Sequence, residues 1–165
     1  MDMARWLALD VGEVRIGVAI SDATGFLASP YTTLYVSRDE SQTWKAIQHL
    51  IEETEAEGLV VGLPISLDGA IHSQGKRVQA FAERLKEQIT VPITFWDERL
   101  STVEAERLLV ERAEAELGKR YKTTGARKQN QTKRRSKKQE VDALAAAVIL
   151  QEYLDANSSE TRGTE

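Results

Sequence analysis

Short apolar runs bounded by turn residues occur near the start of the chain and predict strands. Residues 5–10 and 15–21 are rich in Leu, Val, Ile and Ala, and the turn-forming segment 11–14 lies between them. This arrangement predicts a β-hairpin. A third strand is predicted over residues 31–36, where β-branched and aromatic residues are frequent. The chain is therefore expected to begin with three antiparallel strands.

The spacing of hydrophobic positions then changes to three and four residues, which predicts a helix. Trp44, Ile47 and Leu50 recur at this spacing and predict an amphipathic helix over residues 41–56. Gly58 follows directly and is expected to end this helix, because glycine is typical of the position after the last helical turn.

A strand, a helix and another strand are predicted in the middle of the chain. The apolar run 59–63, bounded by Gly58 and Pro64, is too short for a helix and predicts a buried parallel strand. Helical spacing then returns and predicts a second helix that ends near Gln88. The segment 91–97 predicts a further strand.

The last third of the chain predicts two helices separated by a loop. Residues 101–117 are expected to form a helix, residues 118–138 a basic and mobile loop, and residues 139–155 a final helix with an Ala-rich stretch. The polar tail 156–165 is expected to be disordered. The order of these elements predicts an α/β fold over residues 1–155, one domain with a mixed five-stranded sheet flanked by helices.

Composition restricts the chemistry that the chain can perform. It has 165 residues and no cysteine, which excludes disulfides and thiolate metal sites. Only His49 and His72 could supply imidazole, so any metal should be a hard cation held by oxygen ligands. No apolar run approaches the roughly 20 residues that span a bilayer, and the first residues lack a signal-peptide pattern. We therefore expect a cytoplasmic protein without a membrane partner.

The charge of the chain is unevenly distributed. The formal net charge is −4, but ten Lys and Arg residues and no acidic residue occur between positions 119 and 138. The rest of the chain has 12 basic and 26 acidic residues. Charges are screened over about 8 Å at physiological salt, so a polyanion responds to the local patch more than to the total. The basic segment is a candidate nucleic-acid-binding surface, and a solvated loop without such a role is the alternative.

Acidic residues at three places are candidates for a catalytic site. Asp10 ends the first strand, where ligands of open α/β sheets lie, although a simple turn would also explain it. Asp97 and Glu98 end the last strand and point to opposite faces, so we expect one of them to join a shared site. Both could instead cap the following helix. Asp142 lies in the first turn of the final helix, where the helix dipole alone could account for an acid.

These three positions are more informative together than separately. The alanines at positions 143 and 145–147 are small enough for the final helix to approach the sheet and hold Asp142 over the strand ends. Carboxylates gathered at one edge repel one another unless divalent cations bind between them. Two Mg²⁺ or Mn²⁺ ions could activate water and stabilise the leaving oxygen in phosphodiester cleavage. The residues therefore predict a metal-dependent nuclease whose basic segment holds the substrate.

Short motifs in a fixed order carry a resemblance to a known family. They are residues 9–12 (LDVG), 15–19 (RIGVA), 21–22 (SD), 61–64 (VGLP), 68–69 (DG), 97–102 (DERLST), 141–142 (VD), 145–146 (AA) and 149–150 (IL). In this order the chain resembles the YqgF family, the RuvC-related group of ribonuclease H-like proteins. Members of that group are named as Holliday junction resolvases or as pre-16S rRNA nucleases.

The resemblance implies a ribonuclease H-like fold and a Mg²⁺ or Mn²⁺ site on Asp10, Glu98 and Asp142, with Asp97 as the alternative to Glu98. It implies cleavage of structured nucleic acid, either 5′-end processing of pre-16S rRNA or resolution of a four-way DNA junction. The family's usual assignment favours RNA, and the chain is expected to act as a monomer or a homodimer. The basic residues expected to bind nucleic acid are Arg15, Lys119, Arg120, Lys122, Arg127, Lys128, Lys133, Arg134, Arg135, Lys137 and Lys138.

Two other functions remain open on the residues alone. An actin-like or sugar-kinase-like ATPase would use Asp10 and the glycine after it as a phosphate loop. That class needs two such domains to enclose a nucleotide, and 165 residues supply only one. A nucleic-acid-binding module without catalysis would rely on the basic segment, and its acidic residues would then be structural.

Overall fold

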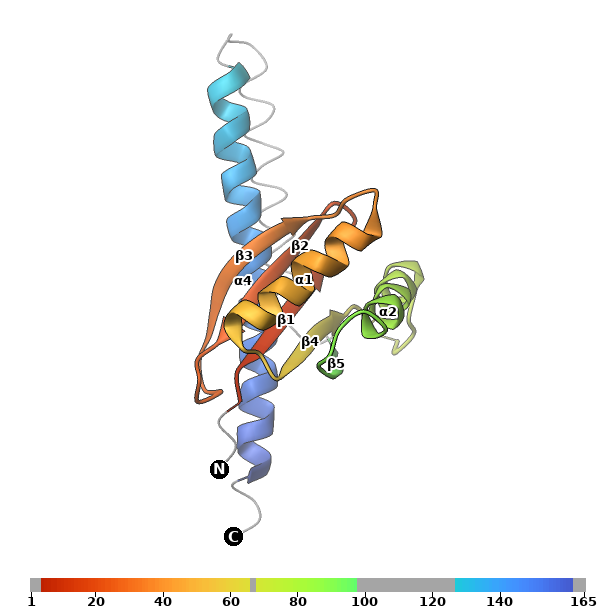
Figure 1. Ribbon diagram of the computed structural model, residues 1–165, viewed down its shortest axis with the longest axis vertical. Helices are drawn as coiled ribbons and strands as arrows, with labels where there is room; N and C mark the ends of the chain where they lie inside the picture. The colour runs from red at the N-terminus through yellow and green to blue at the C-terminus, as the bar shows by residue number, and fades with distance from the viewer. Residues whose placement is uncertain (1–3, 66–67, 98–126, 162–165) are drawn as a thin grey trace.

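Five strands form one sheet with the order β3-β2-β1-β4-β5 (Figure 1). The computed structural model describes residues 4–65, 68–97 and 127–161 of the chain. The strands are β1 (Trp6–Val11), β2 (Arg15–Ser21), β3 (Ala28–Tyr35), β4 (Gly58–Leu63) and β5 (Ile93–Asp97). The helices are α1 (Glu40–Thr54), α2 (Ser73–Lys86) and α4 (Arg127–Thr161).

The sheet is mixed because the leading strands form an antiparallel meander and the later ones are parallel. β1 pairs antiparallel with β2, and β2 with β3. β4 lies parallel to β1 on its other side, and β5 lies parallel to β4. Every residue of β4 is buried, as expected for a parallel strand covered on both faces. The predicted α/β class with a mixed five-stranded sheet flanked by helices is confirmed.

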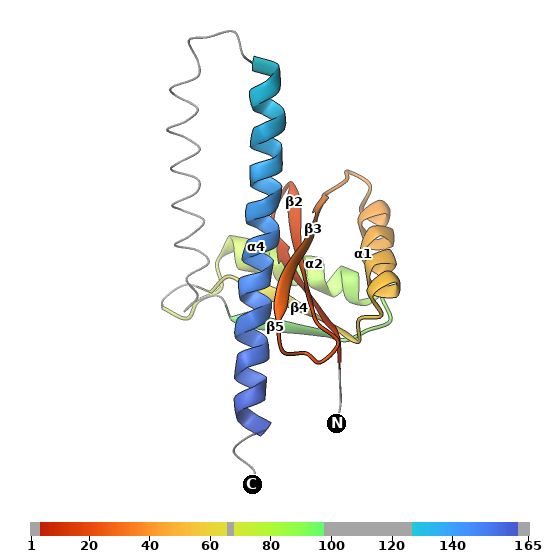
Figure 2. The same cartoon turned by 90° about the vertical axis from the view of Figure 1, so that its left-hand side faces the viewer.

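Helices cover both faces of the sheet, and α4 lies alone on one of them among the described elements (Figure 2). Successive side chains of a strand point to opposite faces. Leu7 and Leu9 of β1 accordingly pack with α1 and α2, whereas Ala8 between them packs with α4. This alternation decides which strand residues can meet a side chain from α4.

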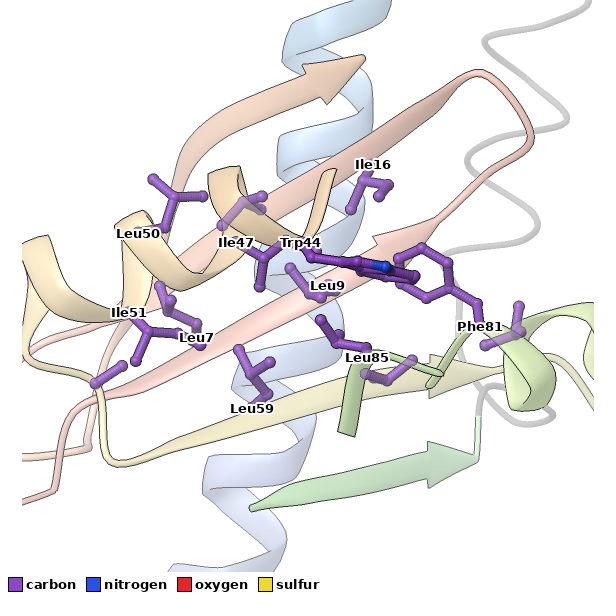
Figure 3. Close-up of a cluster of buried hydrophobic side chains, with 14 of the residues drawn as sticks. Leu7, Leu9, Ile16, Trp44, Ile47, Leu50, Ile51, Leu59, Phe81 and Leu85 are labelled. Carbon is purple, nitrogen blue, oxygen red and sulfur yellow. The ribbon is translucent and has the colours of Figure 1, made fainter. Parts of the chain in front are cut away.

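The larger hydrophobic core lies between the sheet and the pair α1 and α2 (Figure 3). Trp44 of α1 packs against Phe81 of α2, with ring centroids 5.0 Å apart. Leu59 of β4 and Leu85 of α2 are fully buried in the same cluster. Leu, Ile and aromatic residues at helical spacing therefore form this core, as their spacing predicted.

The core under α4 is built from smaller side chains. Ala8 and Ala19 of the sheet face Ala145 and Ala146 of the helix, and all four are buried. Ile149, on the same helix, is fully buried among them. Side chains of this size allow the helix axis to lie close to the strands.

The final helix is longer than the sequence predicted. It was expected over residues 139–155 but spans Arg127–Thr161, so the part of the expected loop after residue 126 is helical. The tail, expected to be disordered from residue 156, continues the helix to Thr161. Residues 127–138 contain no Gly or Pro and are rich in Lys, Arg and Gln, which are good helix formers. The predicted loop is therefore wrong from residue 127 onward.

Other element ends differ from the prediction by one to three residues. β3 begins at Ala28, three residues before the predicted start. α1 ends at Thr54, and Glu55 in the left-handed conformation caps it. Gly58 instead belongs to β4, where a Cβ atom would lie 2.2 Å from the ring of Trp6. Its lack of a side chain is needed for packing and not for ending a helix.

Part of the predicted secondary structure falls on residues that the structure does not describe. The helix predicted over residues 101–117 lies outside the described residues, as do positions 118–126 of the predicted loop. In the described part of the chain, no helix combines the length and the apolar character needed to cross a membrane.

Truncating Ile149 tests the packing of α4 on the sheet. Ile149→Ala should lower the free energy of unfolding by about 2–5 kcal/mol, because it leaves a cavity in a fully buried site. Urea unfolding followed by circular dichroism measures this loss. Leu144→Ala is the matched control on the same helix, since Leu144 is 50% exposed. Equal losses for the two variants would contradict this packing.

Candidate active site

Asp10 lies at the carboxyl end of β1 and is buried, with a relative exposure of 7%. Its neighbours Leu9 and Val11 pack with the α1 and α2 side of the sheet. By alternation Asp10 points to the opposite face, which α4 covers. Asp10 thus has the position at a strand end that a ligand site requires, and its burial distinguishes it from an acid in a solvated turn.

Asp142 reaches the same edge because β2 carries a glycine there. Gly17 is the register partner of Asp10 on the neighbouring strand. A Cβ atom on residue 17 would lie 2.0 Å from the carbonyl oxygen of Asp142 and 2.4 Å from its carbonyl carbon. The backbone of α4 therefore rests directly on the strand beside Asp10. The structure brings these two predicted site residues to one face and one edge of the sheet.

Arg15 forms an ion pair with Asp142. The Nε–H of Arg15 donates to Oδ2 of Asp142 over 2.6 Å. Arg15 begins β2 and lies two residues before Gly17, on the face that α4 covers. The two side chains are 28% and 20% exposed, so water screens the pair only in part. The side chain of Arg15 thus contacts a candidate metal ligand, and the expectation that Arg15 binds nucleic acid stays a prediction.

Hydrogen bonds from β3 hold the start of the sheet-bound part of α4. Thr33 donates its hydroxyl hydrogen to the carbonyl oxygen of Gln139 over 2.7 Å. The side-chain amide of Gln139 donates to the hydroxyl oxygen of Tyr35 over 2.8 Å. These contacts come three residues before Asp142 and fix the point at which α4 leaves the sheet.

The strand alternation separates Asp97 from Asp10. Trp96 is the neighbour of Asp97 in β5, and its indole N–H donates to Glu152 of α4 over 3.1 Å. The Trp96 ring also packs against Tyr153 of α4, with ring centroids 6.0 Å apart. Trp96 therefore faces α4, and the regular strand directs Asp97 to the opposite face. Glu98 lies outside the described residues.

Ser21 and Asp22, which belong to the family motifs, have structural contacts. The Ser21 hydroxyl oxygen accepts the backbone N–H of Trp6 over 2.8 Å. Asp22 accepts the hydroxyl hydrogen of Thr24 and the backbone N–H of Phe26 in the connection between β2 and β3. These hydrogen bonds, that from Thr24 first, hold the pKa of Asp22 below its usual value. Asp22 therefore stabilises the connection between β2 and β3, and Ser21 joins the end of β2 to the start of β1.

The described acids fit a divalent cation by their chemistry. Asp10 and Asp142 supply hard carboxylate oxygens, and Mg²⁺ is commonly held by one or two carboxylates together with water and substrate phosphates. No group of three or more His, Cys, Asp or Glu side chains that could hold a metal occurs among the described residues. A third protein ligand would have to come from the remainder of the chain.

The predicted basic residues fall in two groups. Lys119, Arg120 and Lys122 lie outside the described residues. The other seven after Arg15 occupy the part of α4 between positions 127 and 138, called here the basic arm. The arm projects beyond the sheet at the edge where α1 begins (Figures 1 and 2).

Sequence reasoning did not recognise Gly17 as a site residue. A glycine inside an apolar strand was the available signal, because it often marks a close approach of another backbone. Only the register of β1 and β2 reveals that this approach occurs beside Asp10.

Adding one methyl group at position 17 tests the close approach of α4. Gly17→Ala should lower the free energy of unfolding by about 1–3 kcal/mol, because the new Cβ atom overlaps the backbone of Asp142. Without this overlap the same change would stabilise the protein by about 0.4–1 kcal/mol through the unfolded chain. Urea unfolding gives the sign, and a gain in stability would contradict the geometry.

Comparisons with known proteins agree with the resemblance found in the sequence. The family model described as "RuvX: Holliday junction resolvase" matches residues 4–156. A relative from Thermoanaerobacter pseudethanolicus, named "Putative pre-16S rRNA nuclease", is 40% identical over 94% of this chain and 99% of its own length. A relative of the same name from Desulforamulus reducens is 40% identical over 93% of this chain and 98% of its own length.

Among solved structures, that of T. thermophilus RuvC in complex with a Holliday junction substrate is similar to this chain. It has 14% sequence identity and a TM-score of 0.49 and covers 94% of this chain and 96% of the RuvC chain. The family model covers nearly the whole chain, and the relatives are aligned over almost their full length. The chain therefore belongs to the RuvX family of nucleases, as its resemblance to YqgF proteins implied.

Proposed function

We propose that this chain is a divalent-metal-dependent nuclease that processes the 5′ end of precursor 16S rRNA. One observation carries the proposal. The buried carboxylate of Asp10 lies beside Gly17, and the backbone of Asp142 contacts that glycine. Asp142 belongs to the same helix as the basic residues 127–138. A purely structural domain would not need two acids at one sheet edge on the same side as a cationic helix.

Asp10 and Asp142 would hold the cation together with Glu98. The orientation of Trp96 toward α4 favours Glu98 over Asp97, because Asp97 points to the other face of the sheet. The bound cation would activate water and stabilise the leaving oxygen of the phosphodiester. The carboxylates would fix the position of the cation. The backbone of α4 at Asp142 contacts β2, which holds this carboxylate in place.

The basic arm would hold the nucleic acid close to these carboxylates. The arm and Asp142 belong to one helix, so a strand bound to the arm has a fixed direction relative to the acids. At 1.5 Å per residue the arm is roughly 18 Å long. Binding by Lys and Arg releases counterions from the phosphate backbone, which makes affinity depend steeply on salt.

The names of the relatives favour RNA, and the description of the family favours a second candidate function. The relatives are named after pre-16S rRNA, whereas the family model is described as a Holliday junction resolvase. A resolvase that cuts two strands of a four-way DNA junction is expected to act as a symmetric dimer. Assaying one preparation for cleavage of each substrate, and measuring its oligomeric state on each, distinguishes the two functions.

Asp10→Asn should abolish Mg²⁺- or Mn²⁺-dependent cleavage while nucleic-acid binding survives. The substitution keeps the shape of the side chain but removes the negative charge that binds the divalent cation. Cleavage is measured on a 16S precursor transcript and on a four-way DNA junction, and binding by gel shift. Asp155→Asn, an exposed acid on α4, is the control. Cleavage by Asp10→Asn at the parent rate would exclude the proposed site.

Removing three charges from the basic arm should weaken binding and flatten its salt dependence. Lys133→Ala, Arg134→Ala and Arg135→Ala together should reduce the slope of log K against log salt by roughly two to three. Fluorescence anisotropy over a salt series measures this slope. The matched control, Gln129→Ala with Asn130→Ala and Gln131→Ala, changes three neutral residues of the same helix. Unchanged affinity of the charge variant would remove the arm from the mechanism.

A further inference from the structure

Arg15 has a contact that differs in kind from the other arginine ion pairs of the described residues. Arg77 pairs with Glu13 and Arg84 with Glu40, and in each of those pairs both side chains are about half exposed or more. Exposed pairs of this kind contribute little and are screened by salt. The pair of Arg15 and Asp142 is 28% and 20% exposed and lies at the candidate metal edge.

The geometry of the pair leaves part of Asp142 for another ligand. The contact runs from Nε of Arg15 to Oδ2 of Asp142, so one carboxylate oxygen is engaged and Oδ1 is directed elsewhere. A carboxylate in this situation has a restricted rotation, because a charge-assisted hydrogen bond of 2.6 Å fixes one of its oxygens. Asp142 is then held at both ends, by Gly17 under its backbone and by Arg15 at its side chain.

We propose that Arg15 is a positioning residue that orients Asp142 for the divalent cation. It fixes Oδ2, directs Oδ1 to the cation, and neutralises Asp142 while no cation is bound. This inference rests on the proposed metal-dependent nuclease function. Partners of metal-binding carboxylates act in this way in general, and their loss commonly costs ten- to a hundredfold in metal affinity.

Two other roles for Arg15 predict different outcomes. As a phosphate contact, Arg15 would affect nucleic-acid binding and leave metal affinity unchanged. As a competitor of the cation, Arg15 would weaken metal binding, because a guanidinium near the site repels a divalent cation. A positioning role predicts the opposite sign for metal affinity, so the effect of removing Arg15 on metal binding separates the three.

The experiment measures Mn²⁺ binding to the full chain by isothermal titration calorimetry, without nucleic acid. For Arg15→Gln we expect the Mn²⁺ dissociation constant to rise roughly ten- to a hundredfold. For Arg15→Lys we expect an intermediate value, because an ammonium keeps the charge but lacks the directed Nε–H. The control is Arg84→Gln, which also removes one arginine from an ion pair with a carboxylate, but on the opposite side of the sheet. This control should bind Mn²⁺ as the parent does.

Nucleic-acid binding in the presence of EDTA provides the second readout. Arg15→Gln should bind the RNA transcript as the parent does, because Arg15 acts through Asp142 and not through phosphate. Unchanged or tighter Mn²⁺ binding by both Arg15 variants overturns the proposal. Absence of Mn²⁺ binding by the parent chain would instead overturn the proposed nuclease function, and with it the role of Arg15. The two failures are therefore distinguishable.

Discussion

The contact between the backbone of α4 and Gly17 of β2 is the constraint on which the candidate site depends. It occurs directly beside Asp10, and it sets the height at which Asp142 lies over the sheet. The small side chains of Ala8, Ala19 and the alanines of α4 extend the same close approach along the helix. A larger residue at position 17 would separate the two acids even if every other side chain remained.

Much of this arrangement could be predicted from local sequence, and the rest depends on tertiary geometry. The strands of the meander, the buried β4 and the position of Asp10 followed from apolar runs and strand ends. Asp142 was expected in the first turn of the final helix, which was wrong, because α4 begins at Arg127 and Asp142 lies well inside it. The face that Trp96 takes, which bears on whether Asp97 or Glu98 joins Asp10, is contained in no local pattern, and the preference for Glu98 stays a prediction. The predicted start of the final helix at residue 139 was wrong, because the Lys, Arg and Gln residues before it are good helix formers and the helix begins at Arg127.

Basic residues are concentrated in one segment of the chain, whereas the rest of the chain has an excess of acidic residues. Outside positions 119–138 the acidic residues outnumber the basic ones by 26 to 12. This excess of acidic residues disfavours the approach of phosphates to the rest of the chain, whereas the basic segment favours it. The arm and Asp142 belong to one helix, so the basic residues of positions 127–138 and the candidate site share a single rigid element.

The distance in sequence between the two halves of the site has a consequence for the nascent chain. Arg15 and Asp142 are 127 positions apart, and the contact between them needs α4 as well as the hairpin that contains Arg15. Contacts of such high sequence separation form late in folding, because a long loop must close first. During synthesis the sheet can assemble on the ribosome before α4 has emerged. Asp10 and Asp142 can then meet only after α4 has been synthesised, so the candidate site is assembled after the sheet that carries Asp10.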